Sequence, residues 1–338
     1  MDTHTTYIID GHQDIAFNTI HCTGKNFFEL NRLDQSQVLP EPQLNQSDYV
    51  RLVQSGVKVV QGVIFPYRFT EEGKIESNED FGAEETARQL DFYNELAQKS
   101  QGKVRVLKSK EDLDFVMSTE GALGILVLIE DAIGVRKDFS NLEMLYQKGL
   151  RAIGPVWNRD NQFGGGTDTE IRMTESGLEL VRRMEKLGIA LDTAHMNKND
   201  LIDSLAVFSG IVINSHTCAW SLNHHRRNLT DEQLLAVAKK DGVIGVAFVP
   251  EFLSENKKDA TIESVVSHIN HIVSVIGIDR VAFGSDFDGM SWPNYIDGLS
   301  DSSCFGAARE MLEKIYSQED LEKISYKNWL GVLERILK

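Results

Sequence analysis

The sequence predicts a (β/α)₈ barrel, and three observations support this fold class. Short apolar runs rich in Val and Ile recur along the whole chain. They are nearly continuous in apolar character, as expected for parallel strands that helices cover on both faces. Helical patterns alternate with these runs, and 338 residues suit one barrel with insertions. We therefore expect a single barrel domain over residues 1–338.

The candidate strands are eight in number. In chain order they span Tyr7–Asp10, Val57–Phe65, Gly124–Glu130, Leu150–Trp157, Ile189–Ala194, Ile211–Asn214, Val243–Phe248 and Arg280–Gly284. Long segments follow three of them, at 18–47, 68–81 and 158–173. In a barrel of this type such insertions extend from the C-terminal face and shape the pocket.

The intervening segments have helical signals. Thr230 and Gln233 form a capping-box pair, and Thr261 precedes a one-sided stripe of Ile and Val. Charged and apolar residues alternate at helical spacing over 82–100 and 175–187, as in outer helices of a barrel. The stripe after Thr261 faces away from His271 and leaves His268 at its flank, so we expect both histidines to be exposed.

Composition excludes several classes of partner. The formal charge of −16 would repel nucleic acid and anionic membrane surfaces. No secretion signal or spanning apolar run is visible, and the 3 cysteines are far apart, so we expect a cytoplasmic protein without disulfides. A homo-oligomer is expected from the general frequency of symmetric assemblies.

Metal-binding and proton-transfer residues gather at the ends of the predicted strands. His12 and Asp14 follow the first strand, Glu130 ends the third, and two consecutive strands lead to His195 and His216. These N and O ligands suit zinc or a similar divalent ion. An ionised Glu130 after so apolar a run also requires a balancing cation.

The last strand leads to Asp286, where a carboxylate can exchange a proton beside a metal-activated water. Each of these residues taken singly has a plainer interpretation, as a surface or core side chain. The basic run 224–227 is equally compatible with a surface loop and with a clamp for a carboxylate. We interpret Asp288-Gly289 as a turn and Cys218 as a small packed residue.

Taken in order, these segments resemble the membrane (renal-type) dipeptidase family of the amidohydrolase superfamily. The matching segments are Asp10-Gly11-His12-Gln13-Asp14, Glu130, Asp192-Thr193-Ala194-His195, Ser215-His216, Arg226-Arg227-Asn228 and Gly284-Ser285-Asp286-Phe287-Asp288-Gly289. They extend over nearly the whole chain, which makes the match specific.

The resemblance implies two Zn²⁺ ions and assigns a role to each matching residue. His12 and Asp14 would bind one zinc, His195 and His216 the second, and Glu130 would bridge both. A hydroxide between the ions would attack the peptide carbonyl of a small dipeptide, with L or D stereochemistry at the C-terminal residue. Asp286 would hold the substrate amine and move the proton, and Arg227 would pair with the substrate carboxylate.

The chain departs from the family pattern at three positions. Asp131 follows the bridging Glu130, where family members commonly have glycine. Trp157 occupies the position of a substrate-facing histidine of the mammalian enzymes, and indole can donate a hydrogen bond but cannot act as an acid or ligand. Phe252 falls near a substrate-binding tyrosine, so Arg227 would carry more of the carboxylate recognition.

Two other hypotheses remain open at this stage. The same metal centre would suit an amidohydrolase that opens a lactam or lactone or cleaves an N-acyl amino acid, and Trp157 and Phe252 leave room for that reaction. A hypothesis of another class is a catalytically silent metal-binding barrel. The filled ligand and proton-transfer positions argue against it.

Overall fold

The computed structural model describes residues 7–34, 44–70, 72, 74–291 and 294–338. Eight parallel strands close into a barrel, in the order β2-β1-β11-β10-β9-β8-β7-β6, and β2 pairs with β6 to close the ring. Their bounds are β1 Ile8–Gln13, β2 Val57–Ile64, β6 Leu123–Glu130, β7 Leu150–Gly154, β8 Ala190–Asp192, β9 Val212–Thr217, β10 Val243–Val246 and β11 Val281–Phe283. The predicted (β/α)₈ fold is confirmed.

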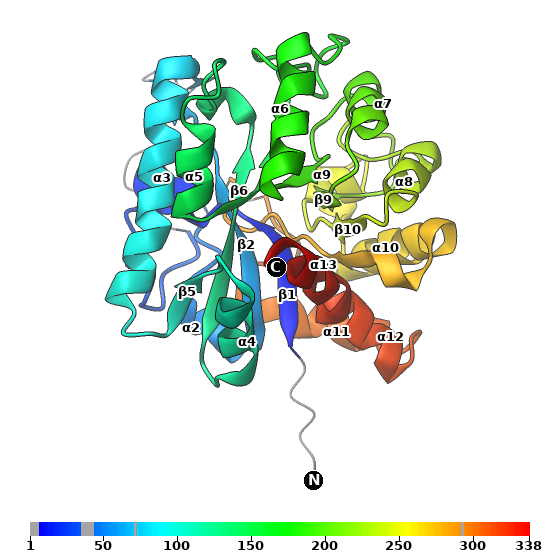
Figure 1. Ribbon diagram of the computed structural model, residues 1–338. Coiled ribbons are helices and arrows are strands. Elements are labelled where there is room, and N and C mark those ends of the chain that lie inside the picture. The colour runs from blue at the N-terminus through cyan, green and yellow to red at the C-terminus, as the bar shows by residue number, and fades with distance from the viewer. Residues whose placement is uncertain (1–6, 35–43, 71, 73, 292–293) are drawn as a thin grey trace.

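Helices surround the strands, as Figure 1 shows. Their bounds are α1 Ile15–Phe17, α2 Tyr49–Gln54, α3 Glu79–Lys99, α4 Lys110–Ser118, α5 Leu142–Lys148, α6 Glu175–Leu187, α7 Lys198–Val207, α8 Asp231–Ala238, α9 Pro250–Leu253, α10 Ile262–Ile276, α11 Phe305–Leu312, α12 Gln318–Glu322 and α13 Asn328–Ile336. Thr230 and Gln233 form the predicted capping box of α8, and Thr261 is the N-cap of α10. Within the part of the chain that is described, no helix combines the length and apolar character needed to cross a bilayer.

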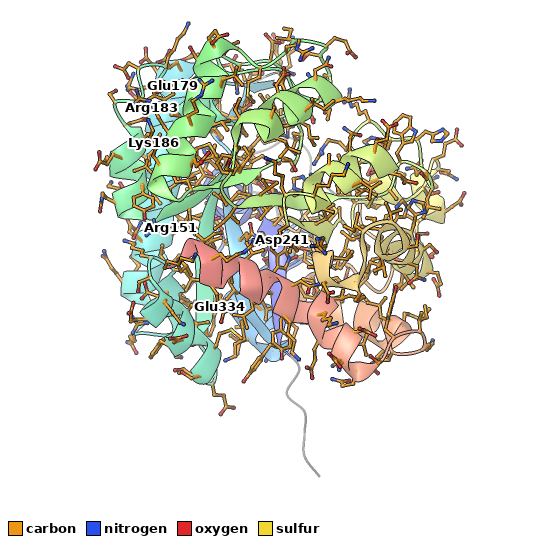
Figure 2. All side chains as sticks on the ribbon, turned by 45° about the vertical axis from the view of Figure 1, so that its right-hand side comes forward. Arg151, Glu179, Arg183, Lys186, Asp241 and Glu334 are labelled. Carbon is orange, nitrogen blue, oxygen red and sulfur yellow. The ribbon has the colours of Figure 1, made fainter. Side chains whose placement is uncertain are left out.

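The outer helices are amphipathic. Helix α6 buries Leu180, Val181 and Met184, whereas Glu179 and Arg183 lie on its outer face and form an ion pair of 2.8 Å (Figure 2). This arrangement places apolar side chains against the barrel and leaves the charges in water, as the sequence pattern predicts.

A buried apolar cluster fills the barrel and joins it to α13. It contains apolar residues from every barrel strand, together with Trp329, Val332, Leu333 and Ile336 of α13. The Trp329 indole is fully buried and donates a hydrogen bond of 2.8 Å to the Phe283 carbonyl oxygen of β11. Helix α13 crosses the centre of the view in Figure 1. Its Asn328 donates to the Val281 carbonyl oxygen at the start of β11, and its Arg335 pairs with Asp241 just before β10. Helix α13 therefore covers the N-terminal end of the barrel and leaves the C-terminal end for a site.

Several boundaries and small elements differ from the prediction. Strand β7 stops at Gly154 and does not reach Trp157, because Pro155 has no N–H for the ladder. The short strand β5 Val104–Val106 pairs with the start of β6, and β3 Arg68–Phe69 with β4 Ile75–Glu76 forms a hairpin in the second insertion. These strands are too short to give a periodic signal.

The prediction that His268 is exposed is wrong. Its side chain is buried on α10, where Nδ1 accepts the Ala219 N–H at 2.9 Å and Nε2 lies 3.2 Å from the Leu253 carbonyl oxygen. Backbone groups of the segment after β9 and of α9 therefore make a polar residue suitable at the edge of the apolar stripe. His271 is half-buried, with Nε2 2.8 Å from Asp231 Oδ1.

Candidate metal centre

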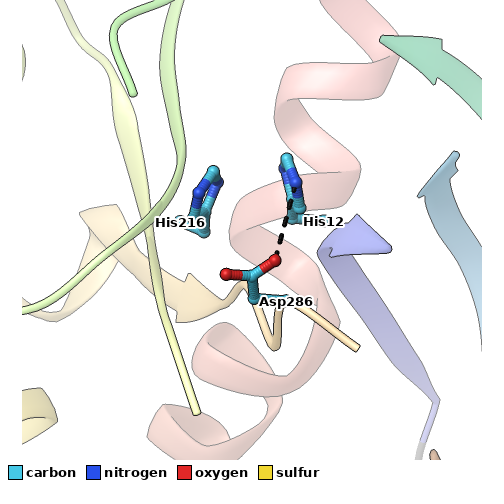
Figure 3. Close-up of side chains that lie close together, drawn as sticks. All are labelled: His12, His216 and Asp286. Atoms are coloured by element: carbon cyan, nitrogen blue, oxygen red, sulfur yellow. Dashed lines mark ion pairs between the residues drawn. The ribbon is translucent and has the colours of Figure 1, made fainter. Parts of the chain in front are cut away.

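Three imidazoles and three carboxylates predicted from the strand ends converge at the C-terminal end of the barrel. His12 lies in β1 with Asp14 just beyond it, Glu130 ends β6, and His216 lies in β9. His195 and Asp286 lie in the segments after β8 and β11. Figure 3 shows the side chains of His12, His216 and Asp286 lying close together, from β1, β9 and the segment after β11.

The ligand atoms lie within a few ångströms of one another. His12 Nε2 is 3.4 Å from Asp14 Oδ2, 3.7 Å from Glu130 Oε1 and 3.8 Å from Asp286 Oδ1. Glu130 Oε1 is also 2.6 Å from His195 Nε2 and 3.6 Å from His216 Nε2. Glu130 Oε1 thus lies within 4 Å of histidines from both predicted ligand pairs.

Burial and neighbouring charges shift the pKa values of the clustered groups in opposite directions. Burial raises the pKa of Glu130 and raises that of Asp286 to about 7. Burial alone would lower the pKa of His12, but the carboxylates of Glu130 and Asp14 raise it to about 10. Burial lowers the pKa of His195 and of His216, which keeps both rings neutral and available as ligands.

The residues present fit a divalent metal. His12 Nε2 is buried without a hydrogen-bond partner. Three overlapping groups have ligand atoms within 4.8 Å of one another: His12 with Asp14 and Glu130, Glu130 with His195 and His216, and His12 with His216 and Asp286. Imidazole nitrogens and carboxylate oxygens in this proportion suit zinc and similar ions.

Each histidine is oriented through its other ring nitrogen. Ser215 Oγ lies 3.2 Å from His12 Nδ1 and 3.0 Å from His216 Nδ1, while the Ser215 N–H donates to the buried carboxylate of Asp192 at 2.9 Å. Asn158 Oδ1 lies 2.8 Å from His195 Nδ1. With Nδ1–H directed at these oxygens, all three Nε2 lone pairs face the centre.

Backbone strain is concentrated at the same place. His195 and Asp286 both have φ of +65°, in the left-handed region that residues with a Cβ rarely occupy. Gly289 shows how closely the chain approaches the centre, because a Cβ there would lie 2.4 Å from Asp286 Oδ1 and 2.7 Å from Asp14 Oδ2. The left-handed backbone conformation at His195 and Asp286 directs both side chains at the cluster.

The centre opens into a pocket of about 350 Å³, which is lined by the three predicted substrate-binding residues Arg227, Trp157 and Phe252. Arg227 is buried, and its Nη2 donates a hydrogen bond of 2.7 Å to His216 Nε2. Its guanidinium lies 5.4 Å from the ring centre of Phe252. Arg227 is therefore part of the site and not of a basic surface loop.

Asp131 has an organising role that the sequence did not reveal. It is fully buried with φ of +79°, and its carboxylate accepts hydrogen bonds from the Tyr67 hydroxyl and Asn161 Nδ2, both at 2.6 Å. The Ile133 and Trp157 N–H groups also donate to it, at 2.8 and 3.1 Å. The residue that replaces a glycine of the family pattern thus fixes the backbone of Trp157.

Asp288 is more than the turn predicted for Asp288-Gly289. Its side chain is buried, pairs with the buried Lys25 and accepts the N–H groups of Gln46 and Ser47. It therefore joins the first insertion to the end of β11, beside Asp14 and Asp286.

The roles of Lys25 and of Asn158 had no signal in the sequence, because each depends on a partner brought close by the fold. Cys218 is buried and donates to the Ala247 carbonyl oxygen, as expected of a packed residue.

Comparison with known proteins identifies the family and the fold. The family model for membrane dipeptidase, peptidase family M19, matches residues 3–338. A protein of Klebsiella pneumoniae described as an uncharacterized protein in the pqqA 5′ region is 32% identical over 73% of this chain and 94% of its own length. The dipeptidase tcpJ of Claviceps purpurea is 27% identical over 75% of this chain, and the match spans 60% of that longer protein.

Solved structures share the fold. A metallopeptidase of Rhodobacter sphaeroides, liganded with a phosphinate mimic of L-Ala-D-Ala, has a TM-score of 0.83 at 23% identity, over 98% of this chain and 99% of its own. A structure described as dipeptidase AC, a metallopeptidase of family M19, has a TM-score of 0.83 at 24% identity, over 99% of both chains. At these identities the likeness concerns the fold.

Proposed function

The chain belongs to the membrane dipeptidase family, peptidase family M19, and from this premise we propose that it is a zinc-dependent hydrolase of small dipeptides with a free amine and a free carboxylate. The observation that carries the proposal is the convergence of His12, Asp14, Glu130, His195 and His216 around one point, with Asp286 beside them. Four ligands arranged around one shared carboxylate suit two ions.

His12 and Asp14 would hold one ion, His195 and His216 the other, and Glu130 both. Divalent ions held by this set supply Lewis-acid polarisation of a carbonyl oxygen and acidify water. The protein's own contribution is orientation and charge: Ser215 and Asn158 hold the imidazoles, and burial keeps bulk water from screening the centre.

Asp286 is the proposed proton-transfer residue. Its Oδ1 is 3.8 Å from His12 Nε2, and its side chain lines the pocket. From there it can hold the protonated amine of a dipeptide, take the proton given up by the attacking water and pass it to the amine that leaves when the peptide bond breaks. A carboxylate at the end of β11 serves both purposes because the two nitrogens of a dipeptide are close together.

Arg227 is the proposed partner of the substrate carboxylate. Its planar guanidinium can bind a carboxylate through two parallel hydrogen bonds, and Phe252 stacks beneath it without a hydroxyl of its own. Recognition of both charged ends would restrict cleavage to dipeptides. The phosphinate mimic of L-Ala-D-Ala bound to the relative of Rhodobacter sphaeroides supports acceptance of a D-residue at the C-terminal position.

The test is amine release from L-Ala-L-Ala and L-Ala-D-Ala and from their N-acetylated and C-amidated forms. Chelator-stripped protein is compared with protein reloaded with zinc, manganese or magnesium. We expect zinc-dependent cleavage of the free dipeptides, lost when either end is blocked. Asp286→Asn should abolish turnover, whereas Asp297→Asn on the exposed surface should not.

Two outcomes would contradict the proposal. Cleavage of N-acetyl amino acids but not of free dipeptides by the zinc-loaded protein would assign the centre to a different amidohydrolase reaction. Tight zinc binding without hydrolysis of any of these compounds would support a catalytically silent barrel.

A further inference from the structure

One side of the pocket is a continuous apolar wall. We define the apolar wall as Phe17, Phe65, Phe69, Ile75 and Trp157, all of which line the pocket. Phe17 contacts Phe65 and Phe69 with ring centres 5.1 and 5.6 Å apart, and Phe65 meets Trp157 edge to face at 5.1 Å. These contacts make one surface out of residues from α1, the end of β2, the β3–β4 hairpin and the segment after β7.

The apolar wall is held rigidly from behind. Tyr67 stacks on Phe65 with ring centres 4.6 Å apart, and its hydroxyl donates to Asp131 at 2.6 Å. The same carboxylate accepts the backbone N–H of Trp157 at 3.1 Å. One buried side chain therefore fixes two members of the wall, and a pre-formed apolar surface binds an apolar group at little cost in conformational entropy.

The other side of the pocket carries charged and polar side chains, with Val249 and Phe252 among them. His225, Arg226, Arg227 and Glu251 line it from the segments that follow β9 and β10. In the closed sheet, β1 and β2 are separated from β9 by β11 and β10 on one side and by β6, β7 and β8 on the other. The residues of the wall that follow β1 and β2 therefore face Arg227 across the barrel mouth, with the metal centre between them.

This opposition orients a dipeptide. If the substrate carboxylate pairs with Arg227, the C-terminal residue lies over the β9 and β10 side. The N-terminal residue then lies on the far side of the scissile bond, where its side chain meets the apolar wall. We infer that the enzyme selects dipeptides with a bulky apolar N-terminal residue, such as Phe or Leu, because burial on this wall removes apolar surface from water.

The inference rests on the proposed dipeptidase function, and its test separates the two. The zinc-loaded enzyme is assayed for kcat/KM on Phe-Ala, Leu-Ala, Ala-Ala, Asp-Ala and Lys-Ala, and on the reversed dipeptide Ala-Phe. We expect Phe-Ala and Leu-Ala to exceed Ala-Ala on the order of tenfold or more, as for added apolar groups in a hydrophobic pocket. Asp-Ala and Lys-Ala should be the poorest substrates.

Phe69→Ser tests the wall directly. Phe69 is half-buried in a surface hairpin, so the variant should fold, which its far-UV spectrum and melting temperature check. We expect the ratio of kcat/KM for Phe-Ala over Ala-Ala to fall toward one. The matched control is Phe92→Ser, which removes a half-buried ring of α3 outside the pocket and should keep the wild-type ratio.

The outcomes distinguish the two proposals. Cleavage of Ala-Ala with no advantage for Phe-Ala, an advantage confined to Ala-Phe, or an unchanged ratio in Phe69→Ser would overturn the apolar-wall inference and leave the dipeptidase function standing. Failure to cleave any of the dipeptides would overturn both.

Discussion

Ser215 Oγ lies 3.2 Å from Nδ1 of His12, so a side chain that cannot reach the metal position determines how a predicted ligand presents its Nε2 atom. The same oxygen lies 3.0 Å from Nδ1 of His216. One hydroxyl therefore sets the ring orientation of His12, a predicted ligand of the first metal ion, and of His216, a predicted ligand of the second. Replacing a hydrogen-bond partner of this kind typically lowers metal affinity about 10- to 100-fold.

Replacing Ser215 with alanine should weaken metal binding without removing a ligand. We expect Ser215→Ala to lower zinc affinity about 10- to 100-fold, because both imidazoles lose the partner that fixes their orientation. Competition with a fluorescent chelator measures this. Ser274→Ala, which removes an exposed hydroxyl bonded within α10, is the control. Equal zinc affinity in the two variants would show that Ser215 has no orienting effect.

Arg227→Lys should separate carboxylate recognition from chemistry. Lysine keeps the charge but cannot form two parallel hydrogen bonds, so we expect KM for free dipeptides to rise on the order of tenfold or more, with kcat less affected. Steady-state kinetics with L-Ala-L-Ala measures the split. Arg172→Lys, at an exposed arginine paired with Asp203, is the matched control. An unchanged KM in Arg227→Lys would remove Arg227 from the proposed carboxylate site.

The barrel could be predicted from the sequence because each strand is a separate apolar run. Such runs, like the periodic pattern of a helix, can be recognised from neighbouring residues alone. The sequence was also sufficient to bring His12, Glu130 and His216 together, since the C-terminal ends of parallel strands meet at one face. It could not assign Lys25 to Asp288 or Asn158 to His195, because these contacts join residues far apart in sequence through loops without a periodic pattern.

Asp131→Gly tests the residue that holds the apolar wall. Glycine relieves the backbone strain at φ of +79°, but the buried Tyr67 hydroxyl loses its acceptor. An unpaired buried polar group costs about 1–3 kcal/mol, so we expect a net loss of unfolding free energy of about that size in urea titrations. Asp131→Asn, which keeps one acceptor oxygen, should lose less.

The matched control for Asp131→Gly is Asp241→Gly. Asp241 also has a positive φ, of +57°, but its side chain is exposed and pairs with Arg280 and Arg335 at the surface. Glycine should change stability little there, because surface ion pairs contribute about 0–1 kcal/mol. A similar small effect at both positions would mean that the hydrogen bonds of Asp131 add nothing to the rigidity of the wall.

His268 should make the protein less stable in mild acid. Burial lowers its pKa from 6.5 to about 4. The unfolded chain therefore binds a proton at pH 5 that the folded chain does not, and stability falls as the pH drops below 6.5 toward 4. From pH 7 to pH 5 the loss of unfolding free energy amounts to about 2 kcal/mol.

His268→Gln should remove that part of the loss in urea titrations, whereas His271→Gln, at a half-buried histidine on the same helix, should retain it. Equal losses in wild type and His268→Gln would mean that His268 takes up its proton without unfolding, and that its contacts to Ala219 and Leu253 yield in acid.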